Sequence, residues 1–251
     1  MAWVTTESLS FTARHDEADA AAAQDLLADL ETFRAELAEL YPKTPGDIAV
    51  IIHPRPWALS VAQPWLPLAR MAASPASRRY MAGWFARREI HVLAPDALEE
   101  RASPVEGSRE ALMLSPLHEY AHIAIAVNNP ALPPPFRPRA FRQMLTWAWL
   151  WAGAAQWLSG QTAHARPAIG RRLREGAEPR FPPALSDALL LGGSVLDLLA
   201  REEGPKAVVN LVADPNPGTP TRALERAFGG RDLIHTAGTW RAHLAHMAGS
   251  D

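Results

Sequence analysis

The sequence predicts an α+β fold in which strands and helices alternate first and helices alone follow. Short β-type apolar segments, such as 47–54 and 88–95, lie among helical patterns before residue 128. From 140 onward, helical patterns are separated only by Gly and Pro. We therefore expect a single domain over 1–251, with a mixed N-terminal lobe (about 1–128) and an all-helical C-terminal lobe (about 138–251).

The elements follow in order along the chain. Residues 8–14 alternate small polar and apolar side chains and predict a strand, and leucines at helical spacing predict a long helix over 16–40. Strands are expected at 47–54 and 88–95, with an irregular proline-containing segment between them. A helix over about 106–127 and a rigid proline-rich loop over 128–139 follow. The remaining helices are predicted at 140–160, 183–203, 205–213, 219–228 and 231–247.

Composition excludes several classes of function. The formal net charge is −2 and no basic stripe is seen, so nucleic-acid binding is not expected. The chain has no cysteine, which excludes disulfides and thiolate metal ligands. Its most apolar stretch, 144–158, is shorter than the roughly 20 residues of a membrane span. Residues 1–19 lack the pattern of a secretory signal, so the cytoplasm is the expected location.

One motif carries a specific chemistry. Residues 117–130, LHEYAHIAIAVNNP, contain His118, Glu119 and His122 in the order His-Glu-x-x-His. On a helix, residues four apart share a face, so the two imidazoles are placed to bind one zinc ion. Glu119 beside them is expected to act as general base for a zinc-activated water. The alternative is a buried helix whose two histidines hydrogen-bond to neighbouring groups.

With this motif placed, the chain resembles the gluzincin-type zinc metallopeptidases of the peptidase MA clan in their small bacterial form. The resemblance rests on the zinc-binding segment SPLHEYAHIAI, the preceding MAGWFARREIHVLAPDA, and the later WLWAGAAQWLSGQ and GGSVLDLLAREEGPKAVVNLV. It implies a zincin-like fold and zinc-dependent peptide hydrolysis. It also implies an edge strand at 89–93, EIHVL, that pairs with an extended peptide substrate.

Two positions depart from the pattern of that family. The resemblance implies a glutamate as third zinc ligand on the second active-site helix, and Ala152 occupies that position. It also implies a tyrosine that steadies the oxyanion, and Leu189 aligns there. A methyl group cannot bind zinc. The alternative function is therefore a catalytically degenerate peptidase-fold protein (a pseudoenzyme) with a binding or regulatory role.

Other side chains are candidates for the missing ligand. Gln156 lies one turn after Ala152, and its alternative role is a hydrogen bond within the core. His164 and Gln161 follow the same helix, and His164 is otherwise a surface histidine. Glu175 is flanked by arginines, which favours a solvated charge, whereas His91 lies on the predicted edge strand. None of these side chains replaces the glutamate by its sequence position alone.

Overall fold

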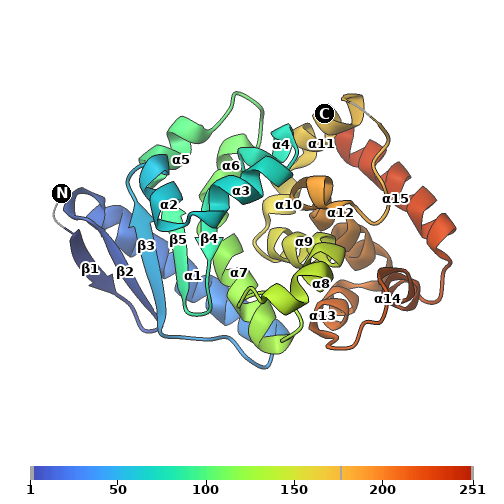
Figure 1. The fold of residues 1–251 in the computed structure, drawn as a ribbon, viewed down its shortest axis with the longest axis horizontal. Helices are drawn as coiled ribbons and strands as arrows, with labels where there is room; N and C mark the ends of the chain where they lie inside the picture. Colours follow the sequence, from blue (N-terminus) through green and yellow to red (C-terminus); the bar gives the residue numbers. More distant parts are fainter. Residues whose placement is uncertain (1–2, 176, 250–251) are drawn as a thin grey trace.

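The computed structural model (Figure 1) describes residues 3–175 and 177–249 and has the predicted α+β fold. The strands are β1 (Trp3–Glu7), β2 (Phe11–Asp16), β3 (Ile48–His53), β4 (Gly83–Phe85) and β5 (Glu89–Leu93). The helices among and after them are η1 (Glu17–Asp19), α1 (Ala20–Leu40), α2 (Pro56–Ala62), α3 (Trp65–Ala72), α4 (Pro75–Arg78), α5 (Pro95–Arg101), α6 (Ser108–Met113) and α7 (Ser115–Asn128). The second half contains η2 (Pro138–Ala140), α8 (Phe141–Thr146), α9 (Ala148–Leu158), α10 (Gln161–His164), α11 (Arg166–Arg174), α12 (Leu185–Glu203), α13 (Pro205–Ala213), α14 (Pro220–Ala227) and α15 (Leu233–Ala248).

The five strands form one sheet in the order β1-β2-β3-β5-β4, with antiparallel strands at both edges. The prediction that 89–93 is an edge strand is wrong, because β5 lies between β3 and β4. Within β5, His91 pairs with Ile51 on one side and with Trp84 on the other. The edge is the three-residue strand β4, joined to β5 by a tight turn that the Ala86 N–H to Glu89 C=O bond closes. So short a strand gives no alternating pattern in the sequence.

The predicted strand at 8–14 corresponds to a turn and part of β2. β1 and β2 form a hairpin, and Leu9 at its tip is 92% exposed. Glu31 on α1 accepts hydrogen bonds from the Ser8 hydroxyl at 2.7 Å and from the Ser10 N–H at 2.5 Å. The carboxylate of α1 therefore stabilises the turn that the sequence pattern did not reveal.

The long first helix is confirmed as α1, and it packs with α7 on one face of the sheet. Its buried stripe is Ala23, Leu27, Leu30, Phe33 and Leu37, which packs in the same core as the inward side chains of β2, β3 and β5. The irregular segment predicted between β3 and β5 instead contains α2, α3 and α4. Both α2 and α4 have proline in their first turn, where a missing N–H costs nothing.

The helical second half is confirmed, with extra breaks. The helix expected over 106–127 divides at Leu114 into α6 and α7, and the one over 140–160 divides at Trp147 into α8 and α9. The prediction missed α10 and α11. α9 packs closely on α12 at two glycines: a Cβ atom added to Gly153 would lie 2.4 Å from the carbonyl carbon of Gly192. None of the helices in the described part of the chain is long and apolar enough to cross a membrane.

Candidate metal-binding site in an apolar cavity

The motif residues lie on α7, at the junction between the sheet and the C-terminal helices. His118 Nε2 and His122 Nε2 are 3.1 Å apart, and the two rings are nearly perpendicular at 86°. Two adjacent ligands on a tetrahedral zinc ion, with bonds of about 2.0–2.1 Å, are separated by about 3.3 Å. The 3.1 Å separation is that of a hydrogen bond between the two imidazoles, which fits the alternative of hydrogen-bonded buried histidines. It is also close to the separation of two zinc ligands.

Glu119 lies against the edge strand β4. A Cβ atom added to Gly83 would lie 2.5 Å from Glu119 Oε1, so only glycine permits this approach. Two residues later, the Phe85 ring stacks on the His122 imidazole, with centroids 4.0 Å apart. β4 therefore positions two of the three motif residues, although sequence reasoning gave it no role in the site.

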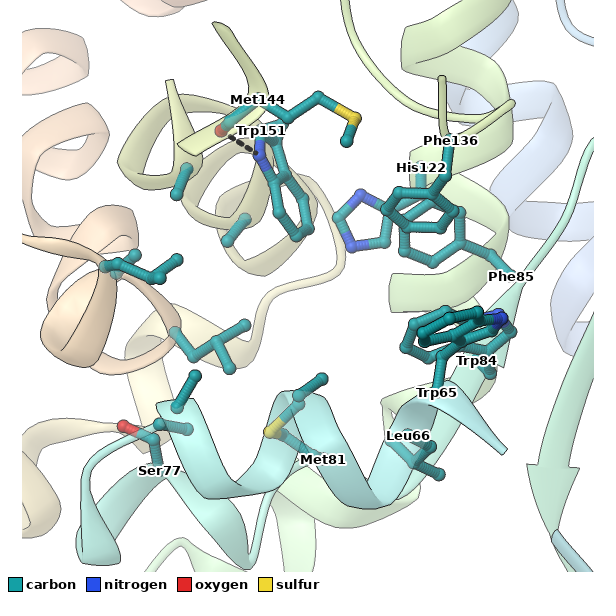
Figure 2. Close-up of a pocket in the computed structure, with 18 of the residues that line it drawn as sticks. Trp65, Leu66, Ser77, Met81, Trp84, Phe85, His122, Phe136, Met144 and Trp151 are labelled. Atoms are coloured by element: carbon teal, nitrogen blue, oxygen red, sulfur yellow. Dashed lines mark hydrogen bonds between the residues drawn. The ribbon is translucent and has the colours of Figure 1, made fainter. Parts of the chain in front are cut away.

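The three motif residues line a cavity of about 850 Å³. Its walls come from α3, β4, α7, α8, α9 and α12, and most are apolar or aromatic. Figure 2 shows Phe85, Trp84 and Phe136 beside His122, with Trp151 facing them from α9. The Trp151 N–H donates to the Met144 carbonyl oxygen at 3.1 Å, which fixes the indole 5.2 Å from the His122 ring. A volume of this size is in the range of ligand-binding sites.

Burial changes the pKa of every titratable motif residue. Loss of solvent raises the pKa of the Glu119 carboxyl well above its usual value. Burial lowers the pKa of His118 to about 4, against the opposing effect of the neighbouring Gln161 amide. Burial first, and His118 second, lower the pKa of His122 well below its usual value. Both imidazoles are therefore neutral at pH 7, the form that binds metal ions.

The position expected for a third ligand faces the same cavity. Ala152 on α9 and Leu189 on α12 both line it, together with the two histidines. The alignment of these two positions is thus compatible with the geometry, and both side chains are apolar. Among the residues that the structure describes, no group of three His, Cys, Asp or Glu side chains could hold one metal ion.

Gln156 lines the cavity, but its amide is engaged elsewhere. Its Nε2 donates to the Leu189 carbonyl oxygen, and its Oε1 accepts the Gly193 N–H at 3.0 Å. Gln161 also lines the cavity, and its Nε2 donates to the Ala111 carbonyl oxygen at 2.7 Å. The hydrogen-bonding alternative for Gln156 therefore fits the structure better than a ligand role.

The other candidate ligands lie outside the cavity lining. His91 is buried beside α2, where its Nδ1 lies 2.9 Å from His53 Nε2 and its Nε2 lies 2.7 Å from Gln63 Nε2. Glu175 forms an exposed ion pair with Arg171 at 2.8 Å. His164 ends α10 and is not among the residues around the motif histidines. The structure therefore does not bring these three side chains to His118 and His122.

The residues present fit a zinc ion in part. The nitrogen pair has suitable spacing, and the imidazoles are held neutral. In the described part of the chain, however, only two candidate nitrogen ligands meet here, whereas catalytic zinc sites have three protein ligands. A two-histidine site is expected to bind zinc weakly unless an external oxygen completes the shell.

Comparison with known proteins adds no further assignment. The sequence matches no family model, and neither the curated proteins nor the solved structures include a chain that matches it. Fold and site are therefore interpreted from the residues of this chain.

Proposed function

We propose that this chain is a zincin-like metallopeptidase-type protein, in which His118 and His122 bind zinc and Glu119 is the general base for peptide-bond hydrolysis. The observation that carries the proposal is the 3.1 Å approach of the two histidine Nε2 atoms in the cavity wall that also contains Glu119. The antiparallel edge strand β4 beside the motif helix supports the zincin-like interpretation.

Each motif residue has a distinct task in this proposal. The neutral imidazoles of His118 and His122 donate lone pairs to the metal. A bound zinc ion supplies acidification of a water molecule, to a pKa of about 7, and polarisation of a carbonyl group. Glu119 accepts the proton of the attacking water and later donates it to the leaving amine. Its raised pKa makes Glu119 a stronger base for the proton that it takes from the water.

The substrate-binding element of the proposal is β4, not β5. As the edge strand, β4 has a row of backbone N–H and C=O groups without a strand partner on its outer side. An extended peptide can pair with such an edge, and the aromatic side chains of Trp84 and Phe85 lie beside it in the cavity wall. Peptides with large apolar residues near the scissile bond suit these walls best.

The decisive experiment measures metal content and hydrolysis in protein purified without a metal-binding tag. We expect zinc to be bound, with loss of zinc in His118→Ala and His122→Ala. Glu119→Gln should retain zinc and lose hydrolysis of an unstructured protein substrate. Glu110→Gln, an exposed carboxylate on α6, is the matched control and should retain both. Unchanged hydrolysis in Glu119→Gln contradicts the role of Glu119 as base.

A second candidate function is a pseudoenzyme that binds ligands in the cavity without hydrolysing them. Two observations favour it. Ala152 and Leu189 place apolar groups where a third ligand and an oxyanion donor are expected. In addition, His122 Nδ1 is buried without a hydrogen-bond partner, whereas zinc-bound histidines usually donate from their second nitrogen. A folded protein that takes up no zinc, even from excess, supports this candidate and contradicts the first.

A further inference from the structure

The mouth of the cavity is bordered by apolar side chains that remain exposed. α3 contributes Trp65, Leu68 and Met71, which are between 54% and 72% exposed. The opposite side contributes Phe136 before α8 and Phe141 and Leu145 on it, which are between 39% and 57% exposed. These six residues are called the cavity rim below. All except Met71 line the cavity itself.

The two sides of the cavity rim belong to one continuous surface. The Trp84 and Phe136 rings stack with centroids 5.4 Å apart and join the β4 side to the segment that precedes α8. Trp65 of α3 and Trp84 of β4 line the same cavity (Figure 2). On α2, which precedes α3 in the chain, Trp57 and Val61 are also exposed, at 63% and 73%. Contiguous exposed apolar patches of this kind usually mark interaction sites.

Arginines are concentrated in the two sequence segments that provide the rim. Residues 48–88 and 120–174, which provide both sides of the rim, contain thirteen arginines and not one of the 27 acidic residues. Their formal charge is +13, whereas the rest of the chain carries −15. Three of these arginines, Arg88, Arg171 and Arg172, are paired with carboxylates from outside the two segments. The net charge of −2 conceals this separation. It is therefore a property of the fold, which brings the two carboxylate-free segments to the same cavity.

The arginines next to the rim are available to a partner. Arg137, Arg139 and Arg142 lie between and beside Phe136 and Phe141 in the sequence. None of the three guanidinium groups forms a hydrogen bond or ion pair with another residue in the described part of the chain. Arg137 also lines the cavity. An anionic partner would thus meet cations without an internal carboxylate to displace.

From this combination we propose that the cavity rim docks on an anionic membrane surface, with the cavity opening toward the lipid. Exposed Trp, Phe, Leu and Met side chains enter the interface between headgroups and acyl chains, and arginines bind the anionic headgroups. A nucleic acid would use the arginines and leave the apolar side chains of α2 and α3 without a function. The docking involves no membrane span and does not require a bound metal.

The test measures co-sedimentation of the full chain with vesicles, in EDTA, so that its outcome is independent of zinc. We expect binding to vesicles that contain phosphatidylglycerol, weaker binding to pure phosphatidylcholine, and a loss of binding at high salt. Arg137→Gln/Arg139→Gln should weaken binding by about fivefold for each arginine. Trp65→Ser/Leu68→Ser should weaken it by about tenfold or more, since each side chain enters the apolar interface.

The controls remove equivalent groups elsewhere. Ile234→Ser removes an apolar side chain that is 87% exposed on α15, and Arg201→Gln/Arg222→Gln removes two exposed arginines from α12 and α14. Both controls should bind vesicles as the unmodified protein does. Absence of vesicle binding at low salt overturns the proposal. The proposal is also overturned if the protein self-associates and Trp65→Ser makes it monomeric while leaving vesicle binding unchanged.

Discussion

Gly83 on β4 and Glu119 on α7 are in direct contact, and the absence of a side chain at position 83 makes room for the carboxyl group. An added Cβ atom would lie 2.5 Å from Glu119 Oε1 and 2.6 Å from its Cγ. The Cγ atom is near the backbone of the motif helix and cannot move far. The edge strand thus fixes the position of the glutamate that the proposed reaction uses as base.

Gly83→Ala is therefore expected to destabilise the protein and displace Glu119. We expect a loss of about 1–3 kcal/mol in the free energy of unfolding, measured with urea, as in other overpacked cores. Gly238→Ala is the matched control, because a Cβ atom at this position on α15 meets nothing within 4 Å. This control should gain about 0.5–1 kcal/mol from helix propensity. Equal stability of the two variants would contradict the close contact.

Ala152→Glu should create the third ligand. Ala152 lines the cavity with both histidines, and a carboxylate there adds an anionic oxygen to a site that has two neutral nitrogens. We expect zinc affinity, measured by competition with a chelator, to increase by at least about 100-fold. Loss of a residue that only hydrogen-bonds to a metal ligand already changes metal affinity by about 10–100-fold. Ala148→Glu, one turn earlier on α9 and also in the cavity wall, is the control and should give a smaller gain. No gain in Ala152→Glu would contradict the alignment of this position.

Gln156→Met distinguishes a structural from a metal-binding role for this amide. The variant loses the hydrogen bonds with the Leu189 carbonyl oxygen and the Gly193 N–H, which lie on α12. We expect a loss of about 1–3 kcal/mol in the free energy of unfolding, because two backbone groups lose their partner. Zinc affinity should stay the same. A fall in zinc affinity with unchanged stability would identify Gln156 as a ligand instead.

The buried pair of His53 and His91 predicts that stability falls in acid. Burial first, and His91 second, lower the pKa of His53 to about 4. The folded state thus favours the neutral form of His53. The resulting contribution to the free energy of unfolding is complete above the unfolded pKa of about 6.5, and it is lost as pH falls toward 4. Between pH 7.5 and pH 5, His53 alone should lower the free energy of unfolding by about 2 kcal/mol.

Urea unfolding at pH 7.5 and pH 5.0, in the presence of EDTA, tests this effect. His53→Gln keeps a polar group beside His91 Nδ1 and removes the titrating one. Its stability should therefore decrease less between the two pH values than that of the unmodified protein, by about 2 kcal/mol. The same decrease in both proteins would assign the acid sensitivity to other groups.

Local patterns were sufficient for the long elements of the fold. α1, α12, α13, α14 and α15 begin and end within a few residues of their predicted positions, because each has a full apolar stripe and Gly or Pro near its ends. β4, α10 and α11 were missed. β4 has three residues and α10 has four, too few for a period to be visible. These short elements depend on tertiary contacts for their formation.

The sequence by itself determined that His118, Glu119 and His122 share a helix and that the two imidazoles lie side by side, since helical spacing alone dictates both. Only the tertiary structure decided which strand is the edge and what surrounds the motif. Strand order depends on a hydrogen-bonded hairpin between β4 and β5, and the cavity is formed by segments more than a hundred residues apart. The cavity depends on the packing of the whole chain, and the hairpin contains a three-residue strand that is too short to give a visible pattern.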